Sequence, residues 1–185
     1  MKKYKLTKET KEHCGIKLYR IEALKDFSDV EKGDKGGFIE KEENLSQNGD
    51  AWVYDDAWVY GNAWVYDDAR VYGNARVYGN ARVYGNARVS DNAYVYDNAR
   101  VYGNARVYGD AYVYGDTWVY GALKLIGGSF YHTKQKSEII EKIENDEICE
   151  TLCREPKLEV EEKPTGKKVK IKVADGQILE GEIVE

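Results

Sequence analysis

Bulky apolar residues are scarce in this chain, which has 185 residues, three of them Phe and one Met. Much of its 42% hydrophobic share is Ala, Val and Tyr, so a large globular core is not expected. No apolar run approaches the length of a membrane-spanning helix, and the basic start Met1–Lys5 lacks the apolar stretch of a signal peptide. We therefore expect a chain that does not enter the membrane.

Cysteine and net positive charge are also lacking. The three Cys, an odd number at wide spacing, argue against a disulfide scaffold and favour a reduced, cytoplasmic protein. The net charge of −5 gives no basic footprint for duplex nucleic acid, which we do not expect as a partner.

A six-residue repeat fills the middle of the chain. From Ala51 to Ala122 there are twelve hexads, in which the first residue is Ala eleven times and Thr117 once, and the third is always Val. The alternation Ala-x-Val-x predicts a short strand with Ala and Val on one face. The Gly-Asn, Asp-Asn and Asp-Asp pairs that follow tolerate positive φ and predict a tight corner. No hexad can bury its apolar face alone, so the hexads must stack on each other.

Such a hexad suits a three-sided coil of eighteen residues. The stretch Val71–Arg76 resembles the hexapeptide-repeat left-handed β-helix, and this resemblance, not the spacing, implies the left hand. Ile39–Asp50 and Leu123–Gly128 read as degenerate hexads, which gives about five coils. We predict a mostly β chain with an N-terminal cap at 1–38, a β-helix at 39–128, a helix at 129–155 and a small β appendage at 156–185.

The second and fourth residues of each hexad point outward and form ladders. These 24 positions hold four Trp, six Arg, thirteen Tyr and Ser90, and no Lys occurs between Lys41 and Lys124. Such a surface is typical of binding sites, although the ladders also brace a thin core. The predicted partner-binding residues, in three columns spaced by eighteen, are Trp52, Arg70, Arg88 and Arg106; Trp58, Arg76, Tyr94 and Tyr112; and Trp64, Arg82, Arg100 and Trp118.

Beyond Gly128 the composition changes to Lys and Glu. Apolar residues between Lys136 and Cys153 give a rough amphipathic stripe that predicts a helix. Val169–Val184 alternates around Asp175-Gly176 and predicts a hairpin, with a weak likeness to the first hairpin of Sm-like or SH3-like barrels.

Signals for catalysis are weak. Many hexapeptide-repeat proteins are acyltransferases with a catalytic His, but His13 and His132 both lie outside the regular array. Cys149 and Cys153 would share a helix face, yet a zinc site normally needs four ligands. We predict no catalytic residue, no metal site and no cofactor, and lean against an enzyme.

The order of Gly15–Phe27, Gly36–Ser46 and the tandem Ala-Arg-Val-Tyr-Gly-Asn repeats resembles a group of phage and prophage proteins that are often labelled transferases on repeat content. This resemblance implies the cytoplasm of a bacterial host. We expect a solenoid that binds a protein partner, with a host defence protein as one target, and that forms homo-oligomers. The alternatives are a nucleotide- or ligand-sequestering module, an acyltransferase and a self-assembling architectural unit.

Overall fold

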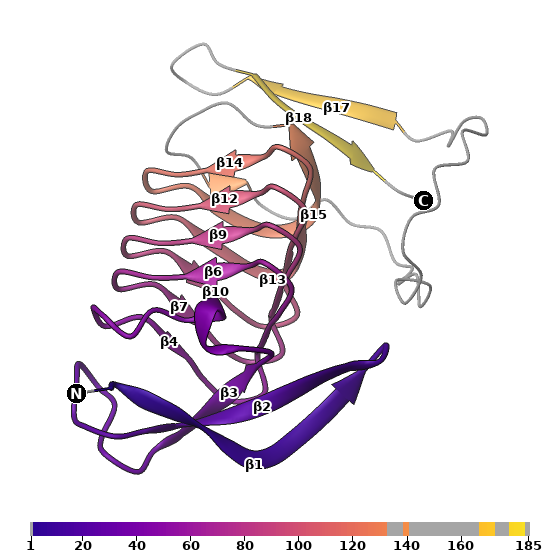
Figure 1. The fold of residues 1–185 in the computed structure, drawn as a ribbon. Coiled ribbons are helices and arrows are strands. Elements are labelled where there is room, and N and C mark those ends of the chain that lie inside the picture. Colours follow the sequence, from indigo (N-terminus) through magenta and orange to yellow (C-terminus); the bar gives the residue numbers. More distant parts are fainter. Residues whose placement is uncertain (1, 133–138, 141–166, 173–177, 184–185) are drawn as a thin grey trace.

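The computed structural model describes residues 2–132, 139–140, 167–172 and 178–183, which form a mostly β chain built around a three-sided solenoid of about five coils (Figure 1). Each regular hexad contributes a strand of two residues, its second and third. These strands are β4 Trp52–Val53, β5 Trp58–Val59, β6 Trp64–Val65, β7 Arg70–Val71, β8 Arg76–Val77, β9 Arg82–Val83, β10 Arg88–Val89, β11 Tyr94–Val95, β12 Arg100–Val101 and β14 Trp118–Val119, with the longer β13 Arg106–Val113 spanning two hexads.

The strands pair in parallel with a register of eighteen residues, as the sequence predicts. Trp58 pairs with Arg76, and Arg76 with Tyr94, while the backbone N–H of Arg76 donates to the Ala93 carbonyl at 2.9 Å. We call the three sides of the coil face 1, face 2 and face 3. Their strands are β4, β7, β10 and the start of β13 for face 1; β5, β8, β11 and the end of β13 for face 2; and β6, β9, β12 and β14 for face 3.

The interior is a narrow column of Val and Ala, and every Val of the twelve hexads is fully buried. Thr117 is the one first-position residue of the twelve hexads that is not Ala. Its hydroxyl donates to the carbonyl of Tyr114 at 2.6 Å, so the buried polar group is satisfied. Small inward residues let the three faces close on one another, which explains why the chain needs few Phe or Met residues.

Each corner depends on a positive φ at the fifth residue of the hexad. All twelve fifth residues have φ between 50° and 68°, and all are Gly or Asp. Gly has no Cβ penalty in this region, and Asp is among the residues that enter it at low cost. The predicted corner chemistry is therefore confirmed.

The N-terminal segment forms a hairpin across one end of the solenoid (Figure 1). Its strands β1 (Tyr4–His13) and β2 (Ile16–Ala23) are antiparallel, and β2 pairs with β3 (Lys35–Ile39), which pairs in parallel with β5. Within this end, a single 3₁₀ turn, Glu42–Asn44, precedes Leu45. Ile39 pairs with Val59, and Leu45 with Val65, so the two predicted degenerate hexads form rungs of the coil. Each pair is separated by twenty residues and not eighteen, so this first coil contains two residues more than the regular coils.

The structure corrects two predictions about the flanks. Strand β15 (Lys124–His132) continues from the last hexad, and β16 (Ile139–Ile140) pairs with it in parallel, so the predicted helix at 129–155 is wrong at these residues. The spacing of apolar residues in this segment predicted a helix, but Ile139 instead pairs with Lys124 as a further parallel strand at the edge of the sheet. The rest of that segment, including Cys149 and Cys153, lies outside the described residues. Cys14 is disulfide-bonded, which the odd cysteine count did not predict.

The predicted C-terminal hairpin is present as β17 (Lys167–Lys172) and β18 (Ile178–Ile183), which pair antiparallel with Val169 opposite Gly181. Strand β18 also pairs antiparallel with β15, so the hairpin extends the solenoid sheet at the end away from the N-terminus (Figure 1). The turn at Asp175 and Gly176 lies outside the described residues.

Candidate functional site

Face 3 is the side of the solenoid that presents its large aromatic side chains most openly. Trp64 and Trp118, at the two ends of its column, are 41% and 44% exposed, and they are the large hydrophobic residues most exposed in the described part of the chain. Between them lie Arg82, which is exposed, and Arg100, whose guanidinium lies 4.9 Å from the Trp118 ring centroid. All four predicted residues of this column therefore lie on one face.

A tyrosine ladder stiffens the same face. Tyr66, Tyr84, Tyr102 and Tyr120 stack in sequence with centroid distances of 4.8 to 5.1 Å and nearly parallel rings. Trp64 continues this stack, because its ring lies 4.0 Å from that of Tyr66. Rings fixed in this way lose little conformational entropy when a partner binds.

Face 2 is partly occupied by the chain itself. The Arg76 guanidinium lies 4.4 Å from the Trp58 ring and 5.3 Å from the Tyr94 ring, and His13 of the hairpin packs 5.0 Å from Trp58. Tyr94 and Tyr112 stack at 4.9 Å. A second ladder, of Tyr60, Tyr78, Tyr96 and Tyr114, flanks them. Trp58 and Arg76 therefore stack on each other, and further internal contacts cover Trp58 with His13 and Arg76 with Tyr94.

Face 1 contains the main correction to the predicted binding residues. Trp52 is only 1% exposed, because Tyr4 and Phe27 of the N-terminal segment pack edge-on against its ring. It is a core residue and cannot present itself to a partner. The hexad pattern could not show this, because the covering residues lie outside the repeat.

Arg70, the next residue of the column, is anchored by the same segment. Its guanidinium donates to Asp29 Oδ2 and to Ser28 Oγ, each at 3.0 Å, and Ser28 has a positive φ of 48°. The Tyr54 hydroxyl also donates to Asp29, at 2.9 Å. Arg88 and Arg106, one and two coils further on, are exposed.

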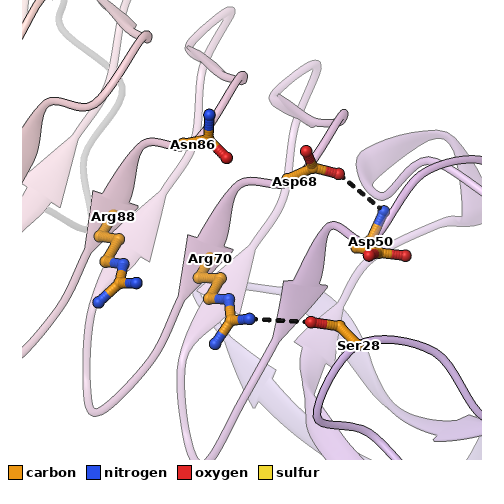
Figure 2. Close-up of a pocket in the computed structure, with 6 residues that line it drawn as sticks. All are labelled: Ser28, Asp50, Asp68, Arg70, Asn86 and Arg88. Atoms are coloured by element: carbon orange, nitrogen blue, oxygen red, sulfur yellow. Dashed lines mark hydrogen bonds between the residues drawn. The ribbon is translucent and has the colours of Figure 1, made fainter.

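Two adjoining pockets open on face 1 and share Arg70 and Arg88. In the first, of about 210 Å³, the Arg70 and Arg88 side chains extend in the same direction, and a row of corner residues runs parallel to the pair (Figure 2). The second, of about 230 Å³, adds aromatic walls. The remaining lining residues are Ser28, Asp50, Asp68 and Asn86 in the first pocket and Asp29, Tyr54, Asp55 and Tyr72 in the second.

Burial and charge set the ionisation of these groups. Burial raises the pKa of the Tyr54 hydroxyl, and its hydrogen bond to Asp29 raises it further. Burial alone would raise the pKa of the Asp29 carboxyl, but the Tyr54 hydrogen bond and the Arg70 charge lower it. At neutral pH the Tyr54 phenol is therefore neutral and the Asp29 carboxylate is charged, and the guanidinium groups of Arg70 and Arg88 line the same pocket.

His13 does not have the surroundings of a general base. Its ring packs against Trp58 and Tyr60, and burial followed by the Arg76 charge lowers its pKa. A base needs a group that orients it and a substrate pocket beside it, and neither pocket described above is lined by His13. His132 lies at the end of β15.

In the described ranges, no three His, Cys, Asp or Glu side chains gather in a way that could hold a metal ion. Those same ranges contain no helix long and apolar enough to cross a membrane.

Comparisons with known proteins match the solenoid. Four overlapping stretches, residues 69–90, 81–97, 93–106 and 105–121, match the family model described as the YdcK β-solenoid repeat. A protein of Escherichia coli strain K12 with the name "Uncharacterized acetyltransferase YdcK" is 40% identical over 63 residues. The match covers 30% of this chain and 19% of that protein, so the chain spans about a fifth of the relative it matches. The likeness supports the repeat fold and leaves the activity open.

Proposed function

We propose that this solenoid is a non-enzymatic binding module that engages a protein partner through face 3. The observation that carries the proposal is the exposure of Trp64 and Trp118 on a face where every neighbouring ring is stacked. Exposed Trp costs free energy unless a partner covers it, and Trp, Tyr and Arg dominate binding hot spots.

The partner should be acidic where it meets the centre of this face. Arg82 and Arg100 lie on consecutive coils between the two Trp residues, so their Cα atoms are about 5 Å apart at the strand spacing. Carboxylates on a partner would form bidentate pairs with them, and apolar pockets would accept the Trp side chains at each end. Because the tyrosine ladder holds the face rigid, binding would need little reorganisation.

The sequence likeness to phage and prophage proteins suggests where such a partner is found. We propose a protein of the bacterial host, with a defence component as one candidate. Neither the family match nor the E. coli relative bears on this step, which rests on that likeness alone.

The test begins with affinity capture from bacterial lysate, followed by purification of the captured protein and measurement of its Kd. The double variant Trp118→Ala/Arg82→Glu should weaken binding at least a hundredfold, because it removes one aromatic anchor and reverses one charge. The matched control is Arg106→Glu, which reverses an exposed charge at the same hexad position on face 1 and should bind as the wild type does. Equal affinity of the wild type and the face 3 variant would overturn the proposal.

The oligomeric state is a separate outcome of the same preparation. If face 3 instead joins two copies of this chain, the wild type will be a dimer by sedimentation and the face 3 variant a monomer. That result would replace the external partner by a second copy.

Acetyl transfer is a second candidate, favoured by the name of the E. coli relative. The family match, residues 69–121 taken together, contains no His. The candidate predicts that acetyl-CoA raises the Tm and that His132→Ala removes the effect. No shift with acetyl-CoA would leave the binding module as the better account.

A further inference from the structure

The two pockets of face 1 share one row of guanidinium groups. Arg70 and Arg88, which line both pockets, are paired in register on neighbouring strands. The first pocket adds residues of the corner that precedes these strands, and the second adds the tyrosines that follow them. Along the chain, Asp68 lies two residues before Arg70, and Tyr72 two residues after it. The two pockets are therefore the two halves of one depression that crosses the Arg row.

The two Arg side chains of this row differ in what holds them. Arg70 forms an ion pair with Asp29 at 3.0 Å and donates to Ser28, so its charge is balanced inside the protein. Arg88 has no hydrogen bond, ion pair or ring contact within residues 2–132. Figure 2 shows its side chain extending in parallel with that of Arg70. An exposed guanidinium aligned beside a pocket can offer paired N–H donors to a carboxylate.

Two carboxylates at the corner side of the first pocket also lack a cationic partner. Asp50 and Asp68 occupy the same corner one coil apart, and Asp68 Oδ1 accepts the Asp50 backbone N–H at 3.3 Å. In the part of the chain that the structure describes, neither carboxylate forms an ion pair. The buried Lys3 ammonium is attracted by both, but it donates to the backbone carbonyls of Gly49 and Ala51. This corner can therefore accept hydrogen bonds from a further cation.

Unpaired charges of both signs thus line one pocket without reaching each other. No ion pair joins Asp50 or Asp68 to Arg88, although all three line the same space of about 210 Å³. A small molecule that satisfies both sides must carry a cation toward the corner and an anion toward the Arg row. The α-ammonium and α-carboxylate of a free amino acid are such a pair, because a single carbon atom joins them.

The second pocket suits the side chain of that amino acid. It measures about 230 Å³, and the rings of Tyr54 and Tyr72 form part of its wall. The Tyr54 ring is held in place because its hydroxyl donates to Asp29 at 2.9 Å. Aromatic rings pack favourably edge-on or offset against other aromatic rings. An aromatic side chain therefore fits this half of the depression better than a charged one.

We propose that face 1 binds a free aromatic amino acid across the row of Arg70 and Arg88. Its carboxylate pairs with Arg88, and its ammonium group donates to Asp68 and Asp50. Its ring lies in the second pocket against Tyr72. The site lies on another side of the coil from the protein-binding surface proposed for face 3 and is independent of it.

The experiment measures binding of phenylalanine to the full chain by NMR titration or calorimetry. Phenylalanine should bind with a Kd below about 1 mM. N-acetylphenylalanine lacks the ammonium charge, phenylalaninamide lacks the carboxylate and glycine lacks the ring, so each should bind at least tenfold more weakly. Absence of phenylalanine binding at about 5 mM would overturn the proposal, and so would any of the three comparison compounds that binds as tightly as phenylalanine.

Two variants test the two sides of the site separately. Asp68→Asn keeps an acceptor for the Asp50 N–H and copies Asn86, which the next coil carries at this position, so the fold should be retained. It should weaken phenylalanine at least tenfold and leave N-acetylphenylalanine unaffected, because that compound has no ammonium group to lose. Arg88→Gln should likewise weaken phenylalanine at least tenfold and leave phenylalaninamide unaffected.

The matched control is Arg82→Gln, the same change on face 3, which should bind phenylalanine as the wild type does. A folded Asp68→Asn or Arg88→Gln protein with wild-type affinity for phenylalanine would overturn the proposal. None of these results would affect the protein partner of face 3.

Discussion

The Asp55 carboxylate accepts the backbone N–H of Gly73, eighteen residues further along the chain, at 3.0 Å. The same bond joins each of the four corner Asp residues to the Gly one coil on. In none of the three corner columns do two Asp residues occupy consecutive coils. The columns are Asp55, Gly73, Asp91 and Gly109; Gly61, Gly79, Asp97 and Gly115; and Asp67, Gly85, Gly103 and Gly121. Asp supplies an acceptor, and Gly on either side keeps its carboxylate away from another.

This arrangement predicts that the same substitution has different effects in two columns. Gly73→Asp would place three carboxylates in a row about 4.8 Å apart, and like charges opposite one another destabilise a sheet. Gly103→Asp would have Gly on both sides and could accept the Gly121 N–H. We expect Gly73→Asp to lower the free energy of unfolding by about 1 kcal/mol more than Gly103→Asp in urea titrations. The difference in the free energy of unfolding between the two variants should shrink in 1 M NaCl, because salt screens the repulsion between carboxylates. A difference that stays the same in 1 M NaCl would indicate steric strain and not charge repulsion.

The tyrosine ladders should contribute to stability only where the rings stack. Tyr84 lies between Tyr66 and Tyr102 with both centroid distances at 4.8 Å, whereas Tyr108 stacks on no ring within residues 2–132. Each stacked pair contributes about 0.5–1.5 kcal/mol beyond its buried area. Tyr84→Leu should therefore lower the free energy of unfolding by about 1–3 kcal/mol more than Tyr108→Leu, measured by urea titration. Equal losses would mean that the ladders are not a source of stability.

The regular part of the solenoid could be predicted from the sequence because each hexad forms the same local structure, a short strand followed by a corner. Val and Ala at period two, with Gly or Asp at the positive φ, fix both the strand and the corner, and the eighteen-residue register then follows for every rung from Trp52 to Trp118. Each residue in this region has the same kind of neighbour one coil away. Local pattern and tertiary structure therefore agree.

The ends could not be predicted in this way, because their contacts join segments that are far apart in the sequence. No sequence pattern around Tyr4 or Phe27 indicates that they pack against Trp52. Likewise, no pattern around Ser28 or Asp29 indicates that they accept hydrogen bonds from Arg70.

Lys3 gives the fold a pH dependence. Its ammonium group donates to the Ala51 carbonyl at 2.7 Å in a buried position, and burial lowers its pKa from 10.5 to about 8. Between about pH 8 and 10.5 the unfolded chain therefore binds the proton more strongly than the folded chain, and the free energy of unfolding rises with pH.

Tyrosine has the opposite effect at higher pH. Burial raises the pKa of Tyr60 from 10.0 to about 12, so above pH 10 the unfolded chain ionises first and stability falls. Urea titrations at a series of pH values should show a maximum near pH 10. Lys3→Met should remove the rise below this maximum and keep the fall above it; a variant with an unchanged rise would exclude Lys3 as its source.

Trp52 and Trp118 occupy equivalent hexad positions but differ in exposure, 1% against 44%, and this contrast tests whether face 3 is available to a partner. Trp52→Ala empties a packed site between Tyr4 and Phe27 and should cost about 3–5 kcal/mol in the free energy of unfolding. Trp118→Ala removes a side chain that is already 44% exposed, so it should cost markedly less, about 1–2 kcal/mol. It should also remove a component of the fluorescence that acrylamide quenches readily. A loss for Trp118→Ala as large as that for Trp52→Ala would mean that Trp118 serves the fold, and the argument for a partner on face 3 would lose its main observation.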